Sequence, residues 1–375
     1  MNSVWVGTKH NGVYTSNSGQ LIAVGFCYDS GFQSIVDQLT DQPQDLIEVL
    51  QSVNGDYAFF VETDSYYAVV TDPWKTKHIW ISTNNNRLLV SNTPVTIRQQ
   101  DQHAYTVDPN TVIVVDKKDF SVKKYTNRSW NLKQTVNNHN AVFDALERSV
   151  ARRYNSESIT TLSSGYDSGV IACALHNLGY KKFSVSFASS EDKTVLAARL
   201  KLHGGTVLPE TGQMTEQEKQ DIRSLYVQRY SLDESGESIA RVCKHMNKIG
   251  KTNILAGNSG DEFYSDYGYL GKQLGEKSLF GGWFPDDLEL IWPWHDYMNK
   301  QSNLISRLDL VSGYFGIQHK EPLLDVELVQ AWLNTTVKLK NRRYKNWMYE
   351  YMIEHNYPML VDVKIGFGND PKFLN

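Results

Sequence analysis

Residues 160–174 read TTLSSGYDSGVIACA and decide the fold of the second half of the chain. An apolar-edged run at 158–162 stops at a cluster of small and hydroxyl residues, and an apolar-periodic segment at 170–178 begins directly behind it. This pattern predicts a strand, a tight loop and a helix. The first N–H groups of such a helix are unpaired and lie at its positive end, so the loop can bind an anion, most often a phosphate.

The side chains of this loop add polar groups to those of the backbone. Ser163, Ser164 and Ser168 supply hydroxyl donors. Asp167 would repel a phosphate directly, which makes sense if a divalent cation lies between its carboxylate and the phosphates. The usual P-loop needs two glycines and a lysine before Ser or Thr, and that spacing is absent. A serine-rich turn that caps an ordinary helix explains the string about equally well at this stage.

The segment 163–168 resembles the S-G-G-x-D-S pyrophosphate loop of the N-type ATP pyrophosphatases. Those enzymes cleave ATP between its α and β phosphates and pass the adenylyl group to a carboxylate or a similar oxygen. The glycine that the family pattern has at position 164 is a serine here, which loses backbone freedom if φ must be positive. The resemblance implies a set of ATP-binding residues: Leu162, Ser163, Ser164, Gly165, Asp167 and Ser168.

Composition and charge narrow the class of protein. A chain of 375 residues with 41% hydrophobic content predicts two domains, because single cores stop growing near roughly 250 to 300 residues. With 38 basic and 42 acidic residues, no basic stripe predicts a nucleic-acid partner. Three cysteines without a C-x-x-C pair predict neither a disulfide framework nor a zinc site. No segment reaches roughly 18 apolar residues, so we expect a soluble, cytoplasmic protein without a membrane partner.

The first 125 residues are rich in short runs of β-branched and aromatic residues separated by turns. Two segments with helical spacing, 32–39 and 43–53, interrupt the runs. Helices packed on antiparallel strands suggest an α+β sandwich. The expected strands are 4–7, 13–15, 21–28, 57–63, 66–71, 78–82, 87–91 and 112–116.

Residues 53–60 (VNGDYAFF) and 71–74 (TDPW) resemble the L-N-G-x-F-A-F and R-D-x-x-G-x-x-P-L-Y stretches of class II glutamine amidotransferase domains. In those domains, an N-terminal cysteine attacks the glutamine amide, with its own α-amino group as base. No cysteine follows Met1, and Cys27 is expected to be a half-buried strand residue. The resemblance implies a degenerate, Ntn-hydrolase-like domain at 1–125 that is kept for structure and packing.

The polar stretch 117–136 is expected to be a linker, and an α/β region follows at 137–375. Strands and helices alternate here, which predicts a parallel sheet whose ligands lie at the carboxyl ends of its strands. Ser186 and Phe187 end the second strand and would line an adenine pocket, although plain core positions explain them nearly as well. The expected helices are 140–154, 194–202 and 215–230, and the strands after the loop are 182–187 and 205–208.

Residues 254–263 (ILAGNSGDEF) resemble the L-S-G-E-G-x-D-E-x-F segment of asparagine synthetase and β-lactam synthetase. A loop containing Gly257 can approach a ligand closely. Asp261 would supply a second oxygen to a Mg²⁺ ion shared with Asp167. By itself the string is also an ordinary turn and helix cap.

Four strings in the C-terminal region extend the resemblance. Residues 307–309 (RLD) and 316–325 (GIQHKEPLLD) are similar to the R-x-D and G-V-E-x-R-x-P-F-L-D strings of the asparagine synthetase superfamily. Lys345 resembles the lysine of the family's K-Y-x-L-R helix, and Lys364 that of its K-x-G-F loop. Two lysines placed before a helix and in a glycine loop can converge on a leaving pyrophosphate and a developing oxyanion.

Over nearly its whole length the chain thus resembles the asparagine synthetase superfamily. The resemblance implies ATP and Mg²⁺ as cofactors, with Mg²⁺ on Asp167 and Asp261. A substrate carboxylate, on a small molecule or a peptide, would attack the α-phosphate of ATP, and an amine would then displace AMP. Lys345 would stabilise the pyrophosphate and Lys364 the second transition state. Without an N-terminal cysteine, the amine would be ammonia, another protein's product or a group of the same substrate.

Two departures from the family pattern concern the general base. Asn258 replaces an acidic or tyrosyl residue, and Gln318 replaces the glutamate of the P-F-L-D string. Neither can act as a base at neutral pH. His319 is a candidate, although a surface histidine is the commoner outcome.

Two other interpretations stay open. Asn258, Gln318 and Ser164 favour a nucleotide-binding homologue without ligase activity. The aromatic-rich segment 280–297 suggests an interaction scaffold, although a buried core or a substrate lid is the commoner use of such a segment. A homodimer is compatible with either interpretation.

Overall fold

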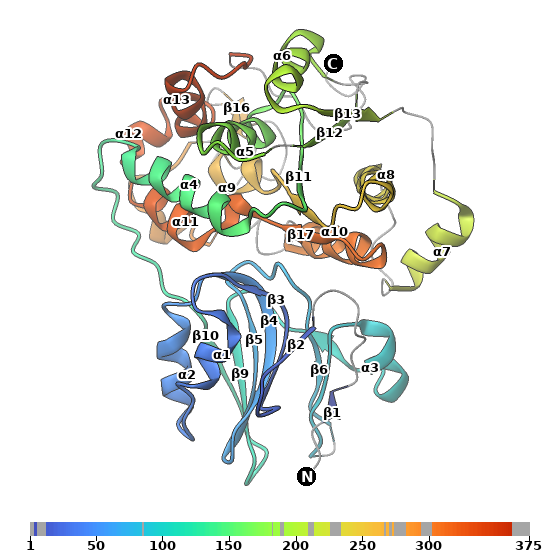
Figure 1. The fold of residues 1–375 in the computed structure, drawn as a ribbon. Helices are drawn as coiled ribbons and strands as arrows, with labels where there is room; N and C mark the ends of the chain where they lie inside the picture. Colours follow the sequence, from blue (N-terminus) through green and yellow to red (C-terminus); the bar gives the residue numbers. More distant parts are fainter. Residues whose placement is uncertain are drawn as a thin grey trace. The chain divides into compact units, whose positions relative to one another are not determined.

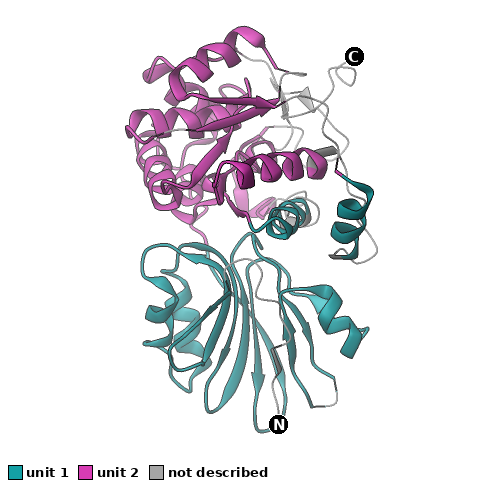
Figure 2. Cartoon of the chain, turned by 45° about the vertical axis from the view of Figure 1, so that its right-hand side comes forward, with its two compact units in different colours: residues 1–129, 215–232, 304–316 teal, residues 130–214, 233–303, 317–375 magenta. Residues whose placement is uncertain are grey.

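The computed structural model describes residues 4–5, 13–84, 86–181, 183–187, 191–208, 214–225, 234–265, 268–269, 272–273, 283–293 and 302–361. Residue contacts divide the chain into two compact units (Figure 2). Unit 1 comprises Met1–Ser129, Thr215–Leu232 and Leu304–Gly316, and unit 2 comprises Trp130–Met214, Asp233–Asn303 and Ile317–Asn375. Unit 1 therefore includes two segments from the second half of the chain. The domain ranges 1–125 and 137–375 stay a prediction.

The larger sheet of unit 1 has the strand order β10-β9-β5-β4-β3-β2, and all its neighbours are antiparallel. Its strands are β2 (Val13–Thr15), β3 (Leu21–Cys27), β4 (Gly55–Glu62), β5 (Tyr66–Thr71), β9 (Thr111–Asp116) and β10 (Val122–Thr126). The smaller sheet has the order β1-β7-β6-β8, in which β1 and β7 are parallel and the other pairs antiparallel. Its strands are β1 (Val4–Trp5), β6 (Trp80–Ser82), β7 (Leu89–Ser91) and β8 (Tyr105–Thr106).

Strand β5 shows why the two sheets stack. Its side chains alternate between the two faces of the sheet, as the pleat requires. Tyr66, Ala68 and Val70 pack with the helices α1 (Gly31–Val36) and α2 (Pro43–Leu50), whereas the side chains between them pack with the smaller sheet. Both faces of the larger sheet are therefore covered, which explains why the strand is apolar at nearly every position.

A third helix covers the outer face of the smaller sheet. Leu89 of β7 packs against Ile97 of α3 (Pro94–Gln100), while Val90 points to the larger sheet. Unit 1 is thus layered as helices, sheet, sheet and helix, with α1 and α2 on one side and α3 on the other (Figure 1). The expected α+β sandwich of antiparallel sheets is confirmed, apart from the parallel pair β1–β7.

The expected linker at 117–136 is wrong in part, because it contains β10. This strand lies at the edge of the larger sheet and most of its side chains are exposed. Lysines at positions 123 and 124 protect such an edge from pairing with another chain. A strand of this kind has no apolar face, so its composition is that of a loop.

Unit 2 contains a sheet of five described strands in the order β13-β12-β11-β14-β17, all of them parallel. The expected parallel sheet is confirmed, and the ATP pyrophosphatase fold as such stays a prediction. The chain runs from β11 outward to β13 and then returns to β14 on the other side of β11, so the strand order reverses between β11 and β14. Open α/β sheets bind ligands at the carboxyl ends of the strands at this point. The strands are β11 (Ser158–Thr161), β12 (Ser184–Phe187), β13 (Gly205–Leu208), β14 (Asn253–Leu255) and β17 (Gln318–Lys320).

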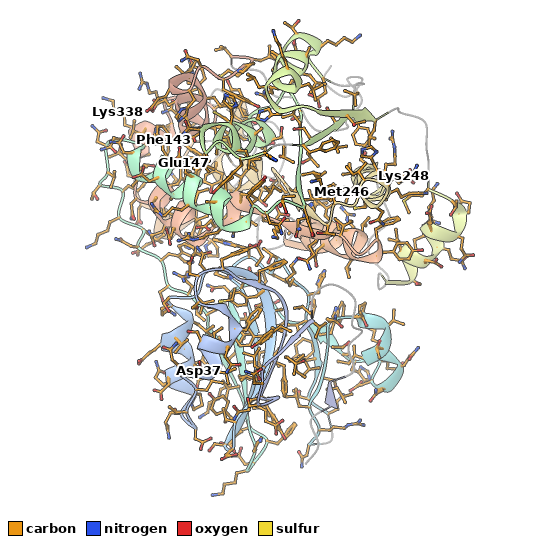
Figure 3. The ribbon with its side chains drawn as sticks, in the orientation of Figure 1. Asp37, Phe143, Glu147, Met246, Lys248 and Lys338 are labelled. Atoms are coloured by element: carbon orange, nitrogen blue, oxygen red, sulfur yellow. The ribbon has the colours of Figure 1, made fainter. Side chains whose placement is uncertain are left out.

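Helices surround this sheet (Figure 1). They are α4 (Asn140–Arg153), α5 (Tyr166–Asn177), α6 (Lys193–His203), α8 (Glu234–Lys248), α9 (Gly260–Tyr264), α11 (Val326–Leu333), α12 (Val337–Lys340) and α13 (Asn346–Glu354). Unit 2 also contains 3-10 turns at Leu288–Leu290 and Pro322–Leu324 and a small hairpin of β15 (Gly268–Tyr269) and β16 (Lys272–Gln273). Phe143 and Glu147 of α4, labelled in Figure 3, both contact Tyr351 of α13, whose hydroxyl donates to the Glu147 carboxylate at 2.9 Å. No helix in the described part of the chain is long and apolar enough to span a membrane.

Two helices from the second half of the chain contribute to unit 1, namely α7 (Glu216–Leu225) and most of α10 (Ser302–Tyr314). Asp309, the last residue of the R-x-D string, forms a buried ion pair with Lys77. Residues 226–230 of the expected helix 215–230 lie outside the described residues. The string therefore helps to hold unit 1 together.

Candidate active site

The loop that follows β11 folds back on its own hydroxyl groups. The Ser163 amide donates to the Ser168 hydroxyl at 2.9 Å, and the Gly165 amide donates to the Ser163 hydroxyl at 3.2 Å. Leu162 is buried and its amide donates to the carbonyl of Val185 in β12, at 2.9 Å. The strand, loop and helix that the sequence predicts are therefore present, and the loop is tightly closed.

The loop after β14 packs directly against the first turn of α5. A Cβ atom on Gly257 would lie 2.7 Å from the amide nitrogen of Ser168, and one on Gly260 would overlap the carboxylate of Asp167. Real Cβ atoms do not approach backbone atoms so closely, so position 257 requires glycine, whereas a side chain at 260 would displace the Asp167 carboxylate. The two glycines bring the loops after β11 and β14 into contact at the point where the strand order reverses.

Two residues beside this contact have left-handed backbones although they are not glycine. Ser259, which precedes α9, has a φ of 67°, and Lys345, which precedes α13, has a φ of 46°. Such conformations cost about 1–3 kcal/mol each and persist only where surrounding structure holds them. They often mark a site whose side-chain positions matter more than local backbone energy.

Three charged side chains from three segments meet at this edge of the sheet. The Lys345 Nζ atom lies 2.5 Å from Asp167 Oδ1 and 3.0 Å from Asp261 Oδ1. The lysine side chain is 1% exposed, whereas the two carboxylates are 24% and 18% exposed. Burial would lower the pKa of Lys345, but the adjacent carboxylates outweigh it and raise the pKa above its usual value. The ammonium group thus stays charged between the carboxylates.

Tyr344 completes the cluster. Its hydroxyl donates to Asp261 Oδ1, and its ring lies 5.8 Å from that of Tyr166 at the start of α5. Burial, followed by the charges of Asp261 and Asp167, holds the pKa of Tyr344 well above its usual value. Tyr344 therefore acts as a neutral hydrogen-bond donor to the carboxylate.

Arg199 of α6 donates hydrogen bonds to carbonyl groups of the loop, and the sequence interpretation missed this residue. The guanidinium is fully buried, and its Nη1 donates to the carbonyls of Ser163 at 2.5 Å and Gly165 at 2.8 Å. Gly169 makes room for it, because a Cβ atom there would collide with the guanidinium. The available signal was an arginine in register with Leu196 on the buried face of a helix.

Glu191, just before α6, was also missed. The Ser164 amide and hydroxyl both donate to Glu191 Oε2, the hydroxyl at 2.5 Å. Burial raises the pKa of Glu191, while the two hydrogen bonds from Ser164 oppose that shift. Ser164, which replaces a glycine of the family pattern, is therefore hydrogen-bonded to a carboxylate of the same chain.

The two departures around the general base have different surroundings. The Asn258 side-chain amide donates to Glu321 Oε1 at 3.1 Å, and His319 Nδ1 lies 2.8 Å from the same oxygen. His319 and Glu321 are both buried, so the expectation of a surface histidine is wrong. Gln318 is half-buried in β17. The Glu321 carboxylate thus lies next to Asn258, and the sequence interpretation gave Glu321 no role of its own.

Two predicted residues lie at the end of β12. Ser186 and Phe187 are buried, and the guanidinium of Arg241 lies 4.5 Å from the centre of the Phe187 ring. Their role in an adenine pocket stays a prediction. Lys364 lies outside the described residues.

The residues fit a magnesium ion that is shared with phosphates. No group of three or more His, Cys, Asp and Glu side chains in the described ranges is placed to hold a metal ion by itself. Proteins usually bind Mg²⁺ through one or two carboxylates together with substrate phosphates, and Asp167 and Asp261 supply two carboxylates around one point. The Ser259 hydroxyl is buried and finds no hydrogen-bond partner among the described side chains and backbone, so a ligand oxygen can satisfy it.

Residues 141–301 match the family model described as asparagine synthase. This part of the chain is similar to the asparagine synthase family. It contains the loop at 163–168, Gly257 and Asp261, whereas Lys345 lies beyond the match. The asparagine synthase family is one of ATP-dependent carbon–nitrogen ligases. No curated protein matches the sequence.

Two solved structures are distantly similar to this chain. One is the glutamine phosphoribosylpyrophosphate amidotransferase of B. subtilis in complex with ADP and GMP, at 12% identity and a TM-score of 0.23, covering 65% of this chain and 62% of that one. Another, titled as the allosteric regulatory enzyme of purine biosynthesis, has 10% identity and a TM-score of 0.20, covering 88% and 77%. The similarity to asparagine synthase therefore rests on the match at residues 141–301.

Proposed function

We propose that the chain is an ATP-dependent, AMP-forming ligase that activates a carboxylate and joins it to an amine. The observation that carries the proposal is the meeting of Asp167, Asp261 and Lys345 beside the serine loop, where the strand order of the sheet reverses. Two acidic groups and one ammonium group suit a metal-bound polyphosphate. A structural ion pair alone would require neither the two left-handed residues nor the two crowded glycines.

The roles of the residues follow from their charges. Asp167 and Asp261 would hold Mg²⁺, which when bound neutralises phosphate charge and polarises the phosphoryl oxygens. Lys345 would move from the carboxylates toward the phosphates and balance the charge on the departing pyrophosphate. Tyr344 would keep Asp261 oriented during this exchange. Arg199 would hold the loop carbonyls in place so that the donors of the loop point to the ligand.

The amine in this proposal is ammonia or an amino group of the same substrate. Cys27 lies at the end of β3 and is paired with Gly55 of β4. Burial raises the pKa of its thiol, which disfavours the nucleophilic thiolate. Unit 1 would therefore lack glutaminase activity.

A second candidate function is nucleotide binding without ligase activity. Asn258 and Gln318 lack a basic group, and the nearby Glu321 is buried and already accepts a hydrogen bond from Asn258. Deprotonation of an attacking amine would then have no base at this position. Tight binding of Mg²⁺–ATP without turnover would favour this candidate.

Exchange of labelled pyrophosphate into ATP, measured across a broad panel of carboxylates, tests the main proposal. We expect exchange with at least one carboxylate and its loss in Asp167→Ala. Asp144→Asn, an exposed aspartate of α4, is the matched control and should keep full exchange. Absence of exchange with every carboxylate, together with an unchanged nucleotide affinity in Asp167→Ala, would refute the proposal.

A further inference from the structure

Ser164 occupies the position in the loop at which the family pattern has a glycine. In this chain, both donors of Ser164 point to Glu191 Oε2. A carboxylate accepts hydrogen bonds from such donors as a phosphate oxygen does. The loop therefore already contains an anion, and this anion belongs to the protein.

The carboxylate of Glu191 is poorly satisfied where it lies. The side chain is 8% exposed, and its second oxygen, Oε1, has no hydrogen-bond partner in the described part of the chain. Leaving a buried acceptor unpaired destabilises that arrangement. Glu191 thus accepts two hydrogen bonds from Ser164 at Oε2, whereas its buried Oε1 has no described partner and destabilises the arrangement. A ligand anion can therefore displace this carboxylate from Ser164 at a reduced cost in free energy.

The backbone on the carboxyl side of Glu191 is fixed to the same serine. The Asp192 amide donates to the Ser164 hydroxyl at 3.0 Å, and Asp192 Oδ1 caps α6 by accepting from the Val195 amide at 2.9 Å. The Ser164 hydroxyl is therefore held from both sides, as a donor to Glu191 and as an acceptor from Asp192. A glycine at 164 would remove both hydroxyl contacts and leave only the amide.

We propose that Glu191 is a built-in anion that closes the loop and competes with the phosphates of a nucleotide for Ser164. This inference rests on the proposed function, because it assumes that the loop binds a polyphosphate. Binding then requires the Glu191 carboxylate to leave Ser164. The apparent affinity is reduced by the fraction of molecules in which the loop is closed.

Calorimetric titration with the non-hydrolysable α,β-methylene analogue of ATP in the presence of Mg²⁺ tests the inference. Glu191→Gln keeps the size of the side chain and removes its charge, and Ser164→Gly removes the hydroxyl. We expect both variants to bind roughly ten- to a hundredfold more tightly than the wild type, the factor that corresponds to about one charge-assisted hydrogen bond. Asp192→Asn is the matched control, because it removes the adjacent charge and keeps a good helix cap.

Equal or weaker binding by Glu191→Gln compared with Asp192→Asn would overturn the competition and leave the proposed function standing. Absence of binding by the wild type and by every variant would overturn both. Amide hydrogen exchange gives a readout without ligand. We expect the Ser164 amide to exchange faster in Glu191→Gln than in Asp192→Asn, and equal rates would refute the contact itself. Melting curves of the variants show that each is folded under the conditions of the titration.

Discussion

Replacing Lys345 by methionine removes the ammonium group and nearly preserves the volume of the side chain. Its Nζ atom lies 2.5 Å and 3.0 Å from two carboxylate oxygens, and the side chain is almost fully buried. Removal of one partner from a buried charge pair costs about 3–5 kcal/mol. Asp167 and Asp261 are partly exposed and can regain some hydration, so we expect the lower end of this range, about 3 kcal/mol.

Differential scanning fluorimetry of Lys345→Met measures this loss. A change of about 3 kcal/mol lowers the Tm by roughly 6–12 °C in a domain of this size. Mg²⁺ should restore part of the stability of the variant, because the two carboxylates then face each other without a counter-ion. The wild type should respond less, since its ammonium competes with the metal. Lys338→Met, at an exposed position of α12 labelled in Figure 3, is the matched control.

Identical melting of Lys345→Met and the wild type, with and without Mg²⁺, would refute this reasoning. It would mean that the ammonium is not the counter-ion of the two carboxylates. The proposed exchange between lysine and metal would then have no structural basis.

Three further predictions test the packing and charge of unit 2. Gly257→Ala would place a carbon 2.7 Å from the Ser168 amide nitrogen, so we expect a loss of about 1–3 kcal/mol in urea unfolding; wild-type stability would contradict the close approach. Arg199→Lys keeps the charge but loses the fork that reaches two carbonyls, which should cost about 1.5–3 kcal/mol and speed hydrogen exchange in the loop. Burial lowers the pKa of Lys340 from 10.5 to about 7, so between these values the unfolded chain binds more protons here and stability should rise with pH. Lys340→Met should flatten that rise in unfolding curves recorded from pH 7 to 10, and an unchanged slope would exclude Lys340 as its source.

The sequence was sufficient to predict the parts of the site that follow from strand ends. Asp167 and Asp261 each follow a strand of a parallel sheet, and the ends of such strands meet at one edge. Lys345 was found through its family pattern. The same reasoning could not find Glu191 or Arg199. Glu191 comes after β12 but is not part of a glycine-rich turn, and Arg199 lies inside α6. Their contacts join positions 27 and 36 residues apart through side-chain geometry alone.

The division of the chain into units was also beyond the reach of pattern reading. The described helix α7 (Glu216–Leu225) lies within the predicted range 215–230, but periodicity does not tell which core a helix will pack against. The buried ion pair of Lys77 and Asp309 joins residues 232 positions apart, and neither residue stands in a run that predicts the other. Strand β10 was missed because an edge strand with exposed side chains lacks the alternation that marks a buried one.

The hold of Arg199 on the loop limits how far the protein can be shortened. Its Nε atom donates to the carbonyl of Pro358 at 2.8 Å, far beyond the end of the matched domain at residue 301. A fragment cut at that boundary would retain both carboxylates, yet it would lose the lysine between them and the last acceptor of the arginine. The smallest piece able to keep the loop in shape must therefore extend at least to Pro358, which sets a lower bound for any minimal version of this half of the molecule.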